Sequence, residues 1–195
     1  KKGVQVDAFK DHVGGGERLY AVFAVEEDVQ LELNLSLYYE IDLIALDVAI
    51  VNDSPEDLYL NTIIPLSATP TTGGGLLISR TPSSCTVLGN HLWMGESKIT
   101  KMDRKGVVTN YWSSAICDTI TGKSLVAGIG ETANATDMIT LKVEGDEFGF
   151  AVVGGCYSDL SNRPLRLRAG RSFKLNRIVL LLDDNIHSGL NHYSS

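Results

Sequence analysis

Three large aromatic residues are the side chains in this sequence best suited to hold a sugar. Trp93, Tyr111 and Trp112 could each present a flat ring to the apolar face of a pyranose. Large aromatic side chains also fill protein cores, because each one buries a large apolar area. The sequence therefore predicts either carbohydrate contact at these positions or packing, including packing against a second domain.

Basic residues gather in one short stretch that contains Arg163, Arg166, Arg168 and Arg171. If this stretch is a strand, Arg166 and Arg168 lie on the same face, because side chains alternate between the two faces of a strand. They could meet an acidic surface of a neighbouring domain or a second subunit. The alternative is a solvated sheet face.

Metal, cofactor and nucleophile chemistry have little support. His187 and His192 are five residues apart, so they do not share a helix face as two zinc ligands at i and i+4 would. The acidic pair Asp183-Asp184 could supply oxygen ligands, but it lacks the spacing of a recognised calcium loop. No G-x-S-x-G elbow is present. We therefore predict no metal, no cofactor and no catalytic residue within this chain.

Cysteine usage also gives no sign of a metal site. The three cysteines lie far apart without C-x-x-C spacing and cannot all pair, so buried free thiols are expected. They are Cys85, Cys117 and Cys156.

Size and charge limit the classes of partner. With 195 residues and 44% hydrophobic content, the chain can build a sizeable core without disulfide staples. Its 17 basic and 24 acidic residues give a net charge of -7, which disfavours nucleic acid and anionic membrane surfaces. No apolar run approaches the roughly 20 residues that span a bilayer. We expect a soluble protein, in the cytoplasm or secreted.

The hydrophobic pattern has the period of β-structure almost throughout. Between Val29 and Tyr38 apolar and polar residues alternate, which is typical of a strand with one covered face. Residues 41–51 are mostly apolar, which indicates a central strand covered on both faces despite Asp42 and Asp47. After a turn, Leu58 to Ile64 continue as a strand, and we expect the two to form an antiparallel hairpin.

A second set of strands follows, around Ile139–Val143 and Phe148–Val152, and Phe173–Leu182 is expected as one long final strand. No convincing helix separates these runs, so the pattern favours an antiparallel sandwich over βαβ units.

The carboxyl terminus is the exception to this pattern. After the possible capping residues Asp183, Asp184 and Asn185, Ile186 and Leu190 fall at helical spacing. A helix of about two turns is not stable alone. We therefore predict a sandwich domain over residues 1–182 and the start of a helical linker over 183–195, with Ile186 and Leu190 as contacts to a neighbouring domain or subunit.

Motifs in the second half of the chain carry a family resemblance. A tryptophan segment, Leu92-Trp93-Met94-Gly95, is followed by Ser113 to Asp118, then Gly122, then Ser124-Leu125-Val126-Ala127-Gly128. In this order they resemble the amino-terminal β-sandwich domain of family 36 glycoside hydrolases, the α-galactosidases and raffinose-synthase-like enzymes. The resemblance covers roughly residues 85 to 195, and the first half matches only as a generic sandwich.

This resemblance implies an all-β fold, a large two-sheet antiparallel β-sandwich of the supersandwich type. It also implies a downstream (β/α)8 barrel in the native chain, whose strand ends carry two catalytic aspartates. The chain would then be a non-catalytic domain that packs on that barrel and supports its loops or its oligomerisation. A galactoside or oligosaccharide and a second copy of the chain are the other implied partners.

Two further functions remain open from the residues alone. One is an autonomous carbohydrate-binding, lectin-like sandwich that uses an exposed aromatic platform. The other is a structural or adhesion sandwich without a small ligand. Whether the parent enzyme hydrolyses its substrate or transfers sugar is not encoded in this chain.

Overall fold

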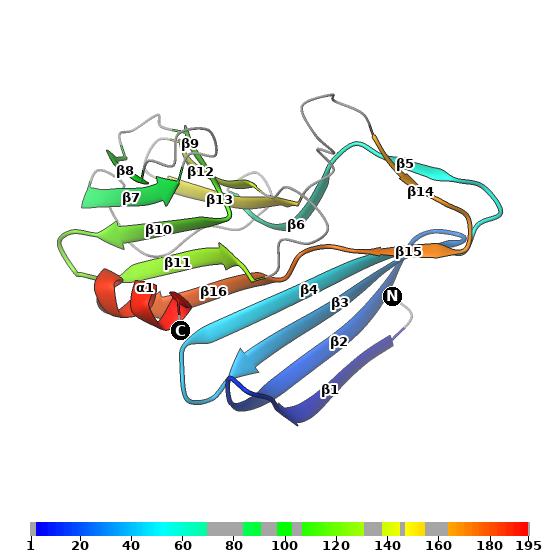
Figure 1. Cartoon of the computed structure of the whole chain (residues 1–195), viewed down its shortest axis with the longest axis horizontal. Helices are drawn as coiled ribbons and strands as arrows, with labels where there is room; N and C mark the ends of the chain where they lie inside the picture. The colour runs from blue at the N-terminus through cyan, green and yellow to red at the C-terminus, as the bar shows by residue number, and fades with distance from the viewer. Residues whose placement is uncertain are drawn as a thin grey trace. The chain divides into compact units, whose positions relative to one another are not determined.

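The computed structural model describes residues 3–69, 84–90, 97–102, 107–130, 138–144, 147–154 and 164–194. Antiparallel strands make up most of this described chain, and the one helix found in it lies at the carboxyl end (Figure 1). The protein is an all-β antiparallel sandwich, which confirms the predicted fold class. Its contacts divide it into two compact units, of which the first comprises Lys1–Ile63, Gly130–Thr136 and Gly154–Val179.

The main sheet of the first unit has the order β1-β2-β3-β4, with antiparallel pairing throughout. Its strands are β1 (Gly3–Lys10), β2 (Gly15–Glu26), β3 (Val29–Tyr38) and β4 (Leu43–Asn52). A short strand, β15 (Arg171–Lys174), pairs with β4. A separate ribbon joins β5 (Leu58–Leu60) to β14 (Leu165–Leu167).

The strands predicted from the period-two pattern form as β3 and β4. On β3, polar residues such as Ser36 share one face and leucines such as Leu37 share the other. Burial near the end of β3 differs from the expected covered apolar face, because Ser36 is buried and Leu37 is 45% exposed. On β4, Ala45 to Val48 are all buried, so this strand is covered on both faces. The carboxylate of Asp47 is one of these buried side chains, in a run that was expected to be apolar.

Two predictions about strands are wrong, one about pairing and one about the bounds of a strand. The expected hairpin between residues 41–51 and Leu58–Ile64 does not form, because β5 pairs with β14 and β4 pairs with β3 and β15. The side chain of Asn52 explains the change of direction, since its amide donates to the carbonyl oxygens of Glu56 and Leu167. The expected single strand Phe173–Leu182 is two strands, β15 and β16 (Ile178–Asp183), and the buried Asn176 lies in the interruption between them.

The second unit comprises Ile64–Ile129, Asp137–Val153 and Leu180–Ser195. One of its sheets has the order β11-β10-β7-β8, with β11 (Ser124–Ile129), β10 (Ser113–Asp118), β7 (Cys85–Asn90) and β8 (Ser97–Lys101). The other has the order β6-β13-β12-β9, with β6 (Ile63–Ala68), β13 (Glu147–Gly154), β12 (Met138–Glu144) and β9 (Val107–Tyr111).

Apolar side chains from both of these sheets form the core of the second unit. Each of the following is at most 4% exposed: Val87, Ala115, Ile116, Leu125, Val126, Ile139 and Leu141. The alternation predicted at Ile139 and Leu141 therefore points into the core. Cys85 is buried here, as expected, whereas Cys117 is half-buried; Cys156 lies outside the described residues.

A tight turn and a helix complete the second unit. Asp118 organises the turn between β10 and β11, because its carboxylate accepts hydrogen bonds from the Ile120 N–H and the Thr121 hydroxyl. Gly122 follows with φ of 81°, a backbone conformation that glycine adopts without steric cost. The predicted helix forms as α1 (Ile186–Ser194). Asn185 caps it by accepting the His187 N–H at 2.9 Å.

Candidate functional site

A sharp corner occurs at Trp112, where the chain passes from β9 of one sheet to β10 of the other. Trp112 has φ of 65°, the left-handed region that bulky residues rarely occupy, and among the described residues it is the only non-glycine there. Its side chain is 47% exposed. Backbone conformations of this kind cost about 1–3 kcal/mol and are often found at functional sites.

Buried polar contacts hold this corner in place. The Asn110 amide donates to the Ser114 hydroxyl at 2.7 Å, and both residues are nearly inaccessible to solvent. The Ile129 N–H donates to the carbonyl oxygen of Trp112 at 2.8 Å. Hydrogen bonds within the second unit therefore hold both the residues that flank Trp112 and the carbonyl group of Trp112 itself.

The three predicted sugar-contact residues differ in what they offer. Trp112 presents a partly exposed indole, whereas Tyr111 is half-buried in β9 opposite Met138 of β12. Trp93 lies outside the described residues. Trp112 is thus the aromatic residue whose geometry fits contact with a ligand or a partner.

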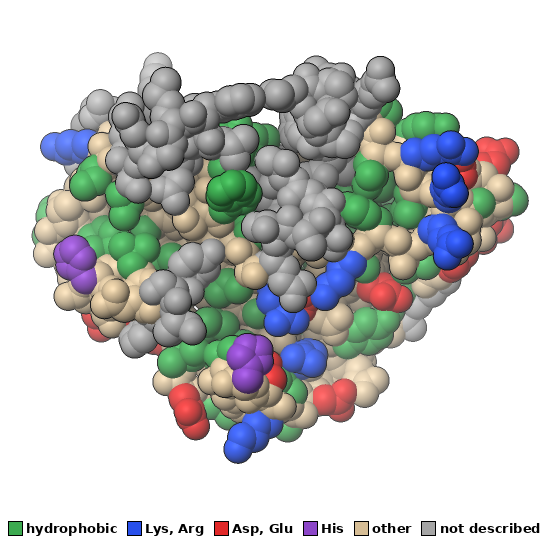
Figure 2. All heavy atoms as spheres, in the orientation of Figure 1, with side chains coloured by type: hydrophobic (Ala, Val, Ile, Leu, Met, Phe, Trp, Pro, Cys, Tyr) green, Lys and Arg blue, Asp and Glu red, His purple; other side chains and the backbone are tan. Residues whose placement is uncertain are grey.

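Arg166 is already engaged within the first unit. Its guanidinium pairs with the Asp57 carboxylate, which also accepts the Ala169 N–H at 3.0 Å. Arg168 follows β14 and lies in the turn to β15, and Arg163 is outside the described residues. Figure 2 shows Lys and Arg side chains, in blue, gathered where β5 and β14 lie. Of the two predicted contact arginines, Arg168 is therefore the freer to meet an acidic partner.

Asp57 should make the stability of the first unit depend on acid pH. The backbone N–H of Ala169, followed by the guanidinium of Arg166, lowers the pKa of Asp57 below its ordinary value of 3.8. A carboxyl whose pKa is lower in the folded state stabilises that state above the unfolded pKa and loses this effect as the pH falls through the folded value. We expect Asp57→Asn to be less stable than the wild type at neutral pH and equally stable well below pH 3.8.

Urea unfolding curves of wild type and Asp57→Asn across this pH range measure the difference directly. Asp42→Asn, at an exposed carboxylate outside this contact, is the matched control and should follow the wild type at every pH. A gap between wild type and Asp57→Asn that stays constant down to the lowest pH would contradict the assignment.

The two predicted contact residues of the terminal helix are half-buried. Ile186 and Leu190 lie four residues apart on α1, which packs on β11. The packing is close at Gly189, where a Cβ atom would lie 3.2 Å from a methyl group of Val126. Part of the apolar surface of each of the two side chains is therefore used inside the second unit.

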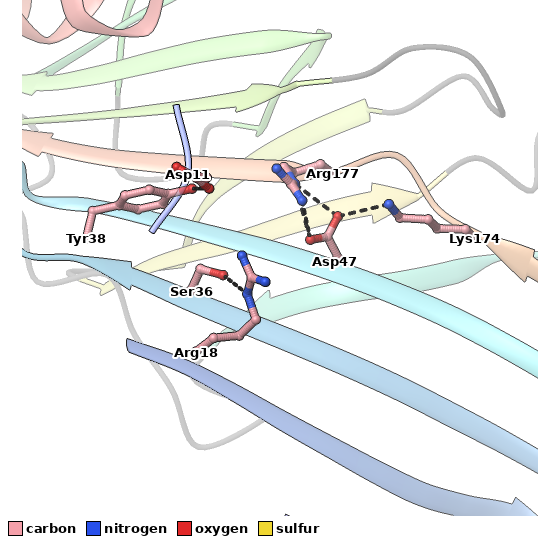
Figure 3. Close-up of polar contacts among 7 residues, drawn as sticks. All are labelled: Asp11, Arg18, Ser36, Tyr38, Asp47, Lys174 and Arg177. Atoms are coloured by element: carbon pink, nitrogen blue, oxygen red, sulfur yellow. Dashed lines mark hydrogen bonds and ion pairs between the residues drawn. The ribbon is translucent and has the colours of Figure 1, made fainter. Parts of the chain in front are cut away.

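A polar cluster that the sequence did not predict occupies the first unit. The Asp47 carboxylate accepts a bidentate contact from the Arg177 guanidinium, at 3.0 and 2.8 Å, and lies 3.5 Å from the Lys174 ammonium (Figure 3). Asp47 is almost fully buried. Because both cations bind the same carboxylate, this Asp47 cluster acts as a structural ion pair and offers no free acid for catalysis.

A second group of contacts lies nearby on the same sheet. Arg18 of β2 donates to the Ser36 hydroxyl at 2.9 Å and stacks on Phe9, 4.3 Å from its ring centre. Tyr38 donates its hydroxyl to Asp11 at 2.9 Å (Figure 3). Its ring also packs edge-on against Phe9. Burial and this hydrogen bond raise the pKa of Tyr38. These contacts tie β1, β2 and β3 together.

Within the described residues, no group of three or more His, Cys, Asp or Glu side chains is arranged to hold a metal ion. A search of the same residues for a helix long and apolar enough to cross a membrane also found none.

No protein-family model and no curated protein matches this sequence. Solved structures do share its fold. An α-galactosidase from Lactobacillus brevis matches with a TM-score of 0.69 and 13% identity, over 99% of this chain and 28% of its own. The GH36 α-galactosidase AgaB from Geobacillus stearothermophilus matches with a TM-score of 0.72 and 14% identity, over 99% and 28% of the respective chains.

A putative aldose 1-epimerase from Klebsiella pneumoniae shares the fold as well, with a TM-score of 0.66 and 12% identity over 98% of this chain and 56% of its own. The chain thus spans little more than a quarter of the α-galactosidases that it resembles. The structural relationship predicted from the Ser124–Gly128 segment is confirmed at the level of the fold.

Proposed function

We propose that this chain is a non-catalytic sandwich domain at the amino-terminal side of an α-galactosidase-like glycoside hydrolase. In that enzyme it packs against a (β/α)8 catalytic barrel and supports the loops of the barrel or its oligomerisation. The observation that carries the proposal is the coverage: nearly the whole chain matches 28% of each α-galactosidase. Most of each α-galactosidase therefore lies outside the part that this chain matches.

The polar chemistry of the described residues supports a structural role. Asp47, the most deeply buried carboxylate among the described residues of the first unit, is neutralised by Arg177 and Lys174. Asp57 is held by Arg166 and a backbone N–H. Retaining glycosidases need two carboxyl groups that face each other about 5–5.5 Å apart across the substrate. These aspartates are instead committed to internal contacts.

The test compares the isolated chain with the polypeptide encoded by its full native gene. With aryl α-galactosides as substrates, we expect no turnover by the chain alone and measurable turnover by the longer product. Deleting residues 1–182 from the longer product should lower its melting temperature or its activity. Robust turnover by the isolated chain would overturn the proposal, and so would a native gene that encodes no barrel.

A second candidate is carbohydrate binding by the domain itself. Its support is Trp112, a partly exposed indole on a fixed and strained corner. Isothermal titration with galactosides should show binding by the wild type and none by Trp112→Ala. Ile120→Ala, at an exposed apolar residue 79% accessible to solvent, is the control and should bind as the wild type does. If the wild type gives no heat of binding, carbohydrate binding by the domain is excluded and only the structural role is left.

A further inference from the structure

Strand β1 lies at the end of the sheet order in the first unit and is unusually open. It pairs with β2 on one side, and within the described part of the chain no strand pairs with its other side (Figure 1). Seven of its eight residues are exposed, and its apolar side chains Val4 and Val6 are 44% and 57% accessible. The outer edge therefore carries a row of backbone N–H and C=O groups that can pair with another strand.

The features that usually protect an edge strand are missing from most of β1. Its register with β2 is continuous from Gly3 to Lys10, so it contains no bulge. It has no proline, and Asp7 is the one charged residue before the terminal Lys10. Edge strands that avoid association typically carry lysines, prolines or bulges.

The side chains of β1 form two distinct faces. Val4, Val6 and Ala8 lie on one face, where they continue the apolar rows of β2 and β3 through the pairs Val4–Ala21 and Val6–Leu19. Gln5 and Asp7 lie on the other face, where the Gln5 amide donates to the Asp7 carboxylate at 2.6 Å. A strand that pairs with this edge must therefore place apolar side chains beside Val4, Val6 and Ala8 and polar side chains beside Gln5 and Asp7.

We propose that β1 pairs antiparallel with β1 of a second copy of this chain, around a twofold axis at Val6. In this register Val6 meets Val6 of the other copy and Val4 meets Ala8, so that the apolar face continues across the junction. On the opposite face Gln5 of each copy lies across from Asp7 of the other, an amide donor next to a carboxylate acceptor. The pairing joins the sheets of the two copies into one.

The sequence of β1 selects this partner and this register. A twofold axis perpendicular to the sheet keeps each face of the strand on the same side, so the axis can pass through Val6 but not between Val6 and Asp7. Moving the axis to Asp7 places two carboxylates directly opposite, which is unfavourable. Moving it to Gln5 leaves Ala8, Phe9 and Lys10 without partners in the described strand, whereas the axis at Val6 leaves only Lys10 without one. The strand is thus complementary to itself in one register.

Sedimentation equilibrium of the whole chain over a concentration series tests the association. We expect a reversible dimer, and we expect Val6→Lys to raise its dissociation constant by about tenfold or more, because two ammonium groups then face each other at the axis. The control is Val25→Lys. Val25 is 62% exposed and lies on β2 beyond the last residue that pairs with β1, so its replacement should leave the dimer intact.

Cysteine cross-linking tests the register independently. Residues directly opposite in an antiparallel pair have Cα atoms about 4.5–5.5 Å apart, within disulfide range. Val6→Cys should therefore give a disulfide-linked dimer under mild oxidation, and mass spectra should show two copies of the same peptide joined through the introduced thiols. Ala8→Cys should not, because the two copies of residue 8 are about 14 Å apart in this register.

The proposal rests on β1 alone and does not depend on the glycosidase assignment. A monomer at all concentrations would overturn it, as would a dimer that Val6→Lys does not weaken. Cross-linking of Ala8→Cys in preference to Val6→Cys would also overturn it. Galactosidase assays of the parent enzyme have no bearing on these results, so failure of either idea is recognisable separately.

Discussion

Asp47→Ala should lower the free energy of unfolding by about 2–3 kcal/mol, because it leaves the Arg177 guanidinium largely buried without its carboxylate. The Asp47 side chain is 10% exposed and that of Arg177 is 32% exposed, so water replaces only part of the lost interaction. Lys174, at 53%, can turn to solvent and should contribute less. Urea or thermal unfolding of the purified variant measures the loss.

Asp42→Ala is the matched control, since it removes the same charge from an exposed position and should change stability by less than about 0.5 kcal/mol. A double-mutant cycle with Arg177→Ala separates the pair from the rest of the cluster. We expect the two single losses to be strongly non-additive. Equal stability of Asp47→Ala and Asp42→Ala would show that the Asp47 cluster does not support the fold.

Gly89→Ala should destabilise the second unit by about 3 kcal/mol, at the upper end of the range for overpacked cores. A Cβ atom at this position would overlap the side-chain amide of Asn110. Asn110 is only 6% exposed and holds Ser114, so it cannot move aside without losing that hydrogen bond. Because Asn110 and Ser114 flank Trp112, the substitution should also alter the tryptophan fluorescence. Urea unfolding followed by that fluorescence measures both effects.

Gly3→Ala is the control for Gly89→Ala, because a Cβ atom there meets no atom within 4 Å. The double variant Gly89→Ala/Asn110→Ala removes the amide from the space that the new methyl group needs. It should therefore be destabilised by less than the sum of the two single variants. Additive losses would mean that the contact between residues 89 and 110 is not the cause.

Much of the fold follows from local pattern. The alternation in β3 and the apolar run in β4 are visible in the sequence because side chains of a strand repeat every two residues. The helix was predictable from its capping residues, and Asn185 caps α1 as expected. Each of these signals acts over a few residues, so no tertiary information was needed.

The errors arise where distant residues decide the pairing. The choice of β14 rather than β4 as the partner of β5 accompanies the contact of Asn52 with Leu167, 115 residues away. The buried role of Asp47 depends on Arg177, 130 residues away. Trp112 was a candidate from its aromatic side chain, but its left-handed backbone was not predictable, because glycine and asparagine are the usual residues there.

The separation of 130 residues between Asp47 and Arg177 has a consequence for synthesis of the chain. At about 5–20 residues per second, the ribosome needs on the order of ten seconds to make the segment between them. During that interval β4 has emerged without β15, so apolar side chains that the finished fold buries, such as Leu46 and Val48, are exposed to water. Nascent chains should therefore bind holding chaperones until residues 171–177 have been translated.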